Sequence, residues 1–331
     1  MNQSERRKYL ITGGAGFIGS HLCDRLINAG HTVVVIDDLS TGRFENIQHL
    51  ISHPKFKFVR ETIMNELVMD RLTSETDVII HLAAAVGVNL IVEDPVRTMR
   101  TNIYGSEMVL NTANRYGCKV LITSSSELYG KNMNVPFKED DDTIMGPTTN
   151  SRWAYATSKS IDEFMGLSYH RQYGLPVIIL RLFNTIGPRQ TGQYGMVVPR
   201  FVQAALRNEP LQVYGDGQQT RTFTDVVDVT RAIDHLSVAP QAVGEVVNVG
   251  ANREISILDL AKLIIDLCKS SSEITIVPYE EAYGTGFEDM QRRVPSLEKI
   301  NNLISYTPEF TLRETIKKVI NFEIEKLKDK I

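Results

Sequence analysis

The chain has 331 residues, 42% of them hydrophobic, which is enough for one large domain or two smaller ones. A formal net charge of -4 provides no bulk basic field, so nucleic-acid binding has no support from composition. The three cysteines, Cys23, Cys118 and Cys268, are far apart and fit no metal-binding spacing, so we expect reduced thiols and no metal site. No apolar run approaches the roughly 20 residues of a membrane span, and we therefore expect a soluble, cytoplasmic protein with no membrane partner.

A strand and a glycine-rich turn come first. Residues 9–12 read as a short buried strand that leads into Gly13-Gly14-Ala15-Gly16-Phe17-Ile18-Gly19, and an amphipathic segment continues to residue 29. Such glycines suit a tight turn, close approach of backbone to a pyrophosphate and close helix packing, while free N–H groups at the helix start face the phosphates. The pattern predicts that a dinucleotide contacts Gly13, Gly16, Phe17, Ile18 and Gly19.

An acidic pair ends the second predicted strand. Residues 31–36 read as a strand and are followed by Asp37-Asp38, about 20 residues beyond the glycines, where an acid accepts hydrogen bonds from ribose hydroxyls. A carboxylate at Asp37 would repel a 2'-phosphate, which favours NAD over NADP. NADP remains the alternative because Arg43 lies nearby in the sequence, and an arginine there can bind a 2'-phosphate.

Further apolar runs alternate with helical stretches. The runs cover residues 56–59, 78–82 and 119–124, and the helical stretches cover 64–73 and 95–116. This alternation predicts an α/β fold with a Rossmann-type, doubly wound parallel sheet, whose ligands lie at the carboxyl ends of the strands. We expect Leu82, Ala83 and Ala84 beside the cofactor, although each small residue could equally serve close packing alone.

The pattern changes after an apolar strand at residues 178–182. Helical segments at 196–207 and 256–268, short strands at 211–214 and 245–249 and a final helix at 312–328 predict a smaller, mixed α/β lobe. We therefore predict an NAD-binding domain over residues 1–182, which carries the catalytic residues, and a substrate lobe over 183–331 that caps the cleft, with possible chain exchange between the lobes. The acidic loop at 140–147 is expected to be solvated.

Residues 124–159 hold the polar groups that can carry chemistry. The stretch opens with Ser-Ser-Ser-Glu-Leu-Tyr-Gly and closes with Arg152-Trp153-Ala154-Tyr155-Ala156-Thr157-Ser158-Lys159. If residues 154–166 are helical, Tyr155 and Lys159 share one face. An ammonium group beside a phenol favours the phenolate, which lowers the tyrosine pKa and makes a general base. An isolated tyrosine and lysine at this spacing more often lie on the protein surface. The glycine turn at the start of the chain is what favours the interpretation as an active site.

Together these motifs resemble the extended short-chain dehydrogenase/reductase superfamily, which contains NAD-dependent nucleotide-sugar epimerases, dehydratases and decarboxylases. The resemblance covers nearly the whole chain and continues through residues 183–189, 198–201, 213–221 and 248–250. It implies bound NAD with Ile63 at the adenine end, although Thr62 stands where relatives have aspartate. It also implies a homodimer through helices around 97–116 and 154–172, and a nucleotide-sugar substrate held by Asn184, Val198, Arg200, Tyr214, Arg221 and Arg293.

The resemblance also implies roles in an oxidation step. Tyr155 would remove the proton of the sugar 4-hydroxyl as NAD oxidises C4, and Lys159 would hold the nicotinamide ribose. Ser125, or alternatively Ser126, would hydrogen-bond the same sugar oxygen. Capping of the strand end is the alternative task for either serine.

Three residues bear on which reaction follows the oxidation. A 4-epimerase has no task for Glu127, whereas a GDP-mannose-type 4,6-dehydratase and a UDP-glucuronate decarboxylase both have one. Arg152-Trp153 and the late Arg293-x-Pro-Ser resemble decarboxylases that act on UDP-glucuronate, where a cation near C6 would hold the substrate carboxylate. A salt bridge at the helix entrance is the alternative for Arg152, and diphosphate binding is the alternative for Arg293.

The leading hypothesis is therefore NAD-dependent decarboxylation of a UDP-hexuronate such as UDP-glucuronate. The alternatives are 4-epimerisation of a UDP-glucose or UDP-glucuronate type of substrate, then 4,6-dehydration of a GDP-mannose type. A non-catalytic NAD-binding sensor or scaffold is a hypothesis of another class. Residues 87–90, which the resemblance places beside the sugar, match neither decarboxylases nor dehydratases closely.

Overall fold

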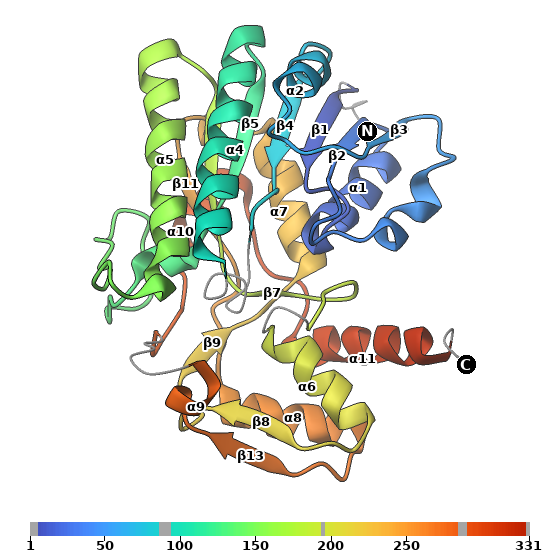
Figure 1. The fold of residues 1–331 in the computed structure, drawn as a ribbon, viewed down its shortest axis with the longest axis vertical. Coiled ribbons are helices and arrows are strands. Elements are labelled where there is room, and N and C mark those ends of the chain that lie inside the picture. Colours follow the sequence, from blue (N-terminus) through green and yellow to red (C-terminus); the bar gives the residue numbers. More distant parts are fainter. Residues whose placement is uncertain (1–5, 86–93, 193–195, 284–289, 329–331) are drawn as a thin grey trace.

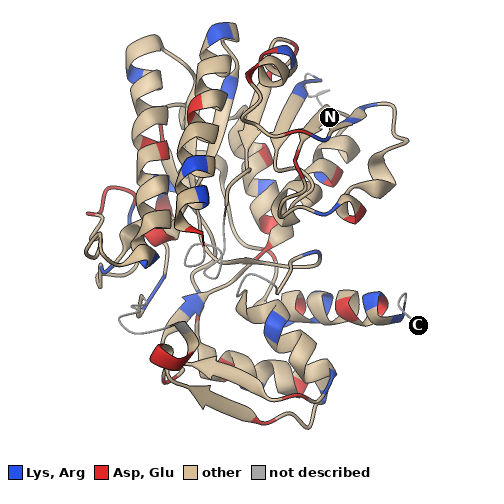
Figure 2. Cartoon of the chain, in the orientation of Figure 1, with Lys and Arg blue, Asp and Glu red and all other residues tan. Residues whose placement is uncertain are grey.

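The computed structural model describes residues 6–85, 94–192, 196–283 and 290–328, so residues 87–90 lie outside it. Figure 1 shows a larger part built around a central sheet and a smaller part beneath it. Acidic and basic residues are interspersed along the chain in both parts (Figure 2). In the described ranges, we find no helix that is long and apolar enough to cross a bilayer.

The larger part contains a seven-stranded parallel sheet in the order β11-β6-β5-β4-β1-β2-β3. This confirms the predicted α/β, Rossmann-type fold. The order reverses between β1 and β4, which is the position where such sheets bind ligands. The strands are β1 Lys8–Thr12, β2 Thr32–Ile36, β3 Phe56–Val59, β4 Val78–His81, β5 Lys119–Ser125, β6 Val177–Leu182 and β11 Val246–Val249.

Helices cover both faces of this sheet, so its strands alternate between two apolar cores. In β1, Tyr9 and Ile11 pack into one core and Leu10 into the other. The first core is closed by α1 Phe17–Asn28, α7 Val226–Val238 and α10 Glu298–Ile304. The second is closed by α2 Glu66–Thr73, α4 Pro95–Tyr116 and α5 Ala154–Tyr173, whose last two members lie side by side (Figure 1).

The smaller part has an apolar core of its own. Residues of α6 Val197–Leu206, α8 Ile257–Cys268 and α11 Leu312–Lys328 pack together against strand β8 Leu211–Tyr214. Strand β8 pairs in parallel with β13 Ile274–Val277, which is followed by the short helix α9 Tyr279–Tyr283. The remaining strand pairs are β7 Thr185–Ile186 with β10 Thr224–Asp225, and β9 Thr220–Thr222 with β12 Glu254–Ser256.

The chain passes between the two parts more than once. We expected the strand at 245–249 in the smaller lobe, but as β11 it pairs with β6 and extends the large sheet. Its residues Val247 and Val249 are fully buried, which a position between two helical layers provides. Helix α7, which the sequence reading did not predict, packs against α1. The predicted boundary after residue 182 stays a prediction. Beyond that residue, the segments that pack in the larger part are α7, β11 and α10.

Candidate functional site

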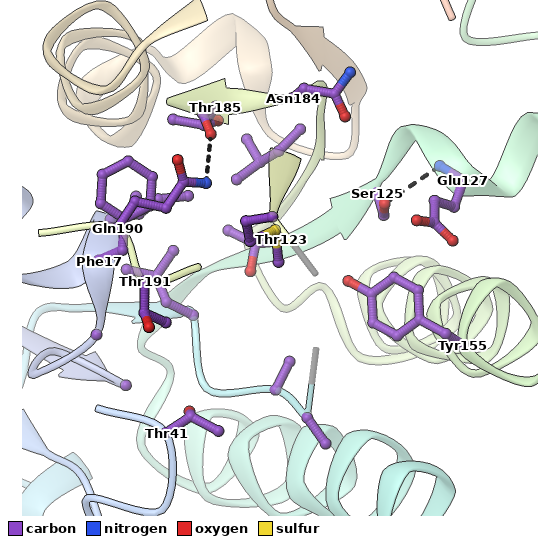
Figure 3. Close-up of a pocket in the computed structure, with 18 of the residues that line it drawn as sticks. Phe17, Thr41, Thr123, Ser125, Glu127, Tyr155, Asn184, Thr185, Gln190 and Thr191 are labelled. Atoms are coloured by element: carbon purple, nitrogen blue, oxygen red, sulfur yellow. Dashed lines mark hydrogen bonds between the residues drawn. The ribbon is translucent and has the colours of Figure 1, made fainter. Parts of the chain in front are cut away.

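A cleft of about 530 Å³ lies along the carboxyl ends of the central strands. Its lining runs from Gly13 in the turn after β1, past Asp37 after β2, to Tyr155 on α5 and to residues of the smaller part such as Tyr214. Both parts of the molecule therefore contribute to one continuous site. Figure 3 shows the end of the cleft where Tyr155 lies near Ser125 and Glu127.

The glycine turn leaves no room for side chains. Gly13 has φ +72°, and a Cβ there would lie 2.8 Å from the backbone nitrogen of Ala83. A Cβ on Gly19 would lie 2.4 Å from the carbonyl oxygen of Gly13. Helix α1 begins directly after Gly16, and no side chain caps that end. Its first N–H groups are therefore available to an anion such as a pyrophosphate.

The carboxylate of Asp37 is fixed at the end of β2. One oxygen accepts a hydrogen bond from the Ala15 N–H at 2.9 Å and the other accepts one from the Leu39 N–H at 2.8 Å. Each oxygen keeps further acceptor capacity for a pair of ribose hydroxyls. Burial raises the pKa of Asp37 although both N–H groups act in the opposite direction. The turn and this acid together fit the phosphates and adenosine ribose of a dinucleotide.

Tyr155 and Lys159 lie on one face of α5, as the i, i+4 spacing predicts. Both side chains line the cleft, with relative exposures of only 6% and 2%. The ammonium nitrogen of Lys159 also lies 3.0 Å from a carboxylate oxygen of Asp162. Burial disfavours the charged lysine, but the fields of Asp162 and Tyr155 outweigh it and raise the pKa of Lys159. Lys159 is therefore a cation at neutral pH.

The predicted lowering of the tyrosine pKa is wrong in its net direction. Lys159 and the hydrogen bond with Ser125 do lower the pKa of Tyr155, as expected. Burial of the phenol is the larger effect, and the negative charge of Glu127 adds to it, so the pKa of Tyr155 is raised. The i, i+4 spacing predicts that Lys159 lies beside Tyr155, but it does not predict how deeply the phenol is buried.

The two candidate serines point to different partners. Ser125 caps the 3₁₀ helix η3 Ser126–Tyr129 by accepting a hydrogen bond from the Glu127 N–H at 3.2 Å, and it also hydrogen-bonds with Tyr155. Ser126 is fully buried and is not part of the cleft lining. Its hydroxyl accepts a hydrogen bond from Arg293 at 2.6 Å. Ser125 is thus the serine that can reach a ligand beside Tyr155.

Glu127 lies between two buried arginines. It forms an ion pair with Arg152, and its second oxygen lies 3.7 Å from the Arg293 guanidinium. Burial alone would raise the pKa of Glu127, but the two guanidinium groups hold it below the ordinary value. Among the described residues, this end of the cleft therefore brings the Glu127 carboxylate together with two cations, and Arg221 is a third cation acting on the same carboxylate.

In the smaller part, the predicted substrate residues line the same cleft. The guanidinium carbon of Arg200 lies 4.1 Å from the centre of the Tyr214 ring, and Asn184 donates a hydrogen bond to the Thr222 carbonyl at 3.1 Å. The predicted residues that the cleft brings together are Gly13, Gly16, Phe17, Ile18, Gly19, Asp37, Asp38, Ile63, Leu82, Ala83, Ala84, Ser125, Glu127, Arg152, Tyr155, Lys159, Asn184, Val198, Arg200, Tyr214, Arg221 and Arg293.

The sequence reading missed several lining residues. Gln190 and Thr191 follow the predicted 183–189 motif directly, and Thr41 comes four residues after Asp37, so proximity to those motifs could have indicated them. Figure 3 shows the Gln190 side chain, which donates a hydrogen bond to the Thr185 carbonyl at 3.0 Å. Tyr279 also lines the cleft, and no local pattern in the sequence indicates it.

Comparisons with known proteins agree with this arrangement. A family model described as GDP-mannose 4,6 dehydratase matches residues 10–319. The UDP-N-acetyl-alpha-D-glucosaminuronate decarboxylase of Bacillus cytotoxicus is 39% identical over 97% of this chain and 99% of its own length. The UDP-glucuronic acid decarboxylase 1 of Xenopus tropicalis is 36% identical over 97% of this chain and 73% of its own length.

Solved structures include a similar fold with ligands. The UDP-glucuronic acid 4-epimerase of Bacillus cereus, in complex with UDP-glucuronic acid and NAD, aligns with a TM-score of 0.87 at 30% identity, over 97% of this chain and 99% of that one. Its fold therefore agrees with the fold described above. The chain therefore belongs to the GDP-mannose 4,6-dehydratase family, within the extended short-chain dehydrogenase/reductase superfamily of NAD-dependent enzymes.

Proposed function

We propose that the protein is an NAD-dependent decarboxylase of a UDP-hexuronate. The observation that carries this proposal is the pairing of Glu127 with Arg152 and Arg293, all three of which line the same cleft as Tyr155. Two buried cations around one carboxylate leave excess positive charge for an anionic group of the substrate. The names of the two relatives described above support a uronate substrate.

The fit of the glycine turn and Asp37 supports NAD as the cofactor, with the phosphates at the start of α1 and the adenosine ribose at Asp37. Bound NAD supplies the reversible oxidation of C4 of the sugar. Tyr155 would remove the proton of the 4-hydroxyl, and Ser125 would donate a hydrogen bond to the same oxygen. Lys159 would hold the nicotinamide ribose and favour the phenolate form of Tyr155.

The arginines would act on the step that releases carbon dioxide. A 4-keto hexuronate is a β-keto acid: the C5–C6 bond breaks, carbon dioxide leaves and the electron pair becomes an enolate over C5, C4 and the C4 oxygen. Arg152 and Arg293 would orient the carboxylate, Ser125 and Tyr155 would hold the enolate oxygen, and Glu127 would keep the guanidinium groups in place. A proton then adds to C5, and reduction of C4 completes a UDP-pentose with no net redox change.

The same residues leave two other outcomes to be tested. Reduction of the 4-keto sugar from its opposite face would give a 4-epimer of unchanged mass, and removal of the C5 proton by Glu127 with loss of water would give a 4,6-dehydrated sugar. The name of the Bacillus cytotoxicus relative also favours a 2-acetamido hexuronate as a second candidate substrate. A non-catalytic NAD-binding role is the remaining class.

We also propose which part of the chain binds which ligand, and where in the cell the protein is located. Residues 1–182 would bind NAD and carry the catalytic residues, while residues 183–331 would bind the nucleotide through Asn184, Val198, Arg200, Tyr214 and Arg221. The uridine nucleotide is supported by the names of the relatives. The cysteines are all free thiols, which is compatible with the proposed cytoplasmic location.

The first prediction concerns the reaction itself. Incubation with UDP-glucuronate or with UDP-N-acetylglucosaminuronate should release carbon dioxide and give a nucleotide sugar lighter by that mass, measured by mass spectrometry. Tyr155→Phe should fold normally and lower kcat by at least about 100-fold, because the base is lost. A product of unchanged mass, or one lighter by water, would contradict decarboxylation. Equal activity of wild type and Tyr155→Phe would favour the non-catalytic class.

The second prediction concerns the arginine pair. Arg152→Gln and Arg293→Gln should each lower kcat/KM for the uronate by about 100-fold or more, because a buried cation that binds and orients the substrate carboxylate is lost. Arg292→Gln is the matched control, since Arg292 is 46% exposed and pairs with Glu254. It should stay within about twofold of wild type. If the Arg292 variant loses as much as the other two, the carboxylate site is wrongly assigned.

The third prediction concerns the glycine turn. Gly13→Ala should weaken NAD binding by at least about tenfold, measured by calorimetry, because the new Cβ would meet backbone atoms of Leu82 and Ala83. Gly117→Ala is the control: its φ is +68°, but its Cβ would meet no atom within 4 Å. It should lose stability without losing NAD affinity. Unchanged NAD affinity in Gly13→Ala would remove the turn from the cofactor site.

The fourth prediction concerns assembly, for which we propose a homodimer through α4 and α5. These neighbouring helices expose apolar side chains: Val96 is 67% exposed, Tyr104 51% and Phe164 74%. Phe164→Glu should shift the molecule toward the monomer in light scattering, because a charge would be buried at the interface. Leu67→Glu, at an 84% exposed position on α2, should not. A monomeric wild type, or a dimer in Phe164→Glu, would contradict this interface.

A further inference from the structure

Asp162 is a buried acid that the proposed reaction does not use. It lies on α5, three residues after Lys159, and its side chain is fully inaccessible to solvent. One carboxylate oxygen lies 3.0 Å from the Lys159 ammonium nitrogen, and the other has no hydrogen-bond partner among the described residues. A buried carboxylate that is only half satisfied is costly, so its presence beside a cleft-lining lysine calls for a physical reason.

In the part of the chain that the structure describes, the other charged and titratable groups around Lys159 do not balance its charge. Glu163 on the same helix is engaged by Arg181 at 2.8 and 2.9 Å. His81 at the end of β4 is neutral, because burial and the nearby Lys159 lower its pKa to about 3. Tyr155 is a neutral phenol at pH 7, since its pKa is raised, and Glu127 pairs with Arg152. Asp162 is therefore the counter-charge in contact with Lys159.

We propose that Asp162 is a positioning residue. It keeps the buried ammonium group of Lys159 charged and holds that group on the face of α5 that also carries Tyr155. The catalytic meaning of this role rests on the proposed function of Tyr155 and Lys159. Burial to 2% exposure favours a neutral lysine, and a neutral lysine neither favours the phenolate nor donates all its hydrogen bonds to a ribose. The Asp162 carboxylate, one turn further along the same helix, stabilises the charged form of Lys159.

The two roles of Asp162 have opposite effects on Tyr155. Asp162 favours the phenolate form of Tyr155 indirectly, because it keeps Lys159 charged. The negative charge of Asp162 itself disfavours the phenolate. Removal of the carboxylate makes the local field more positive. The first proton then leaves the Tyr155–Lys159 pair at lower pH, whichever of the two groups loses it. A smaller share of that singly deprotonated pair is the productive phenolate with a charged lysine.

The test that needs no substrate is a titration of Lys159 in the intact protein. With lysine labelled with ¹³C at Cε, the Lys159 signal is identified by its loss in Lys159→Met. In Asp162→Asn the signal should titrate at least about one pH unit lower than in wild type. Asp259→Asn is the matched control, since Asp259 and Lys262 also form a pair three residues apart but are about 60% exposed. It should leave the Lys159 signal unchanged.

The second measurement is the pH profile of kcat/KM with the nucleotide sugar that the wild type converts. In Asp162→Asn the acid limb should move to lower pH and the plateau should fall, while Asp162→Glu, which keeps the charge, should retain the wild-type limb. An unmoved Lys159 titration overturns the proposal even if no substrate is found. A plateau that falls while the limb stays in place also overturns it, because that is the effect of a structural role alone.

Folding of the variants provides a last check. If Asp162→Asn does not fold, Lys159→Met/Asp162→Asn should fold with nearly the wild-type melting temperature, since it leaves no buried charge unpaired. That result would support Asp162 as the partner of Lys159. Failure of the double variant to fold would mean that α5 needs Asp162 independently of Lys159, and the proposal would fall.

Discussion

The parallel direction of the seven strands is the constraint on which the rest of the structure depends. It brings the ends of β1, β2, β4 and β5 to one edge, so that a glycine turn, an acid and a serine far apart in the sequence line one cleft. The edge beside β5 and β6 is further held by a buried polar network. Tyr129 in η3 donates a hydrogen bond to Asn248 of β11 at 2.8 Å and accepts one from Arg181 of β6 at 3.0 Å. This network fixes the segment that carries Glu127 to the sheet.

Charge balance is the second constraint on the site. Lys159, Arg152 and Arg293 are each less than a tenth exposed, and a cation withdrawn from water is stable only beside a partner. Asp162 faces Lys159, while Glu127 faces both arginines. Counted over the described residues, the first pair is neutral, whereas the second group keeps an excess positive charge. An anionic substrate group is therefore favoured at the Glu127 end of the cleft and not at the Lys159 end.

Local patterns predicted the parts of the structure that depend on near neighbours. Apolar runs located the strands up to β6 within a residue or two, and the spacing of Tyr155 and Lys159 gave their common face. The place of β11 depends instead on the free edge of β6, and the sign of the Tyr155 pKa shift depends on burial by distant segments. Neither the position of β11 nor the direction of this pKa shift can be predicted from a short stretch of sequence. Asp162 could have been found at i+3 from Lys159, but spacing alone does not tell a buried pair from an exposed one such as Asp259 and Lys262.

The orientation of Ser126 shows how the site couples two distant segments. Its neighbour Ser125 faces Tyr155, but Ser126 is turned behind the cleft and accepts a hydrogen bond from Arg293. Arg293 enters from the late part of the chain, in a segment whose Pro295 bridges to Phe137 in the loop that follows η3. The hydroxyl of Ser126 thus holds the Arg293 guanidinium group beside Glu127, while Ser125 remains on the cleft side, where we propose that it contacts the sugar oxygen. In the proposed reaction, these two adjacent serines would therefore act at different ends of the site, Ser125 beside Tyr155 and Ser126 through Arg293.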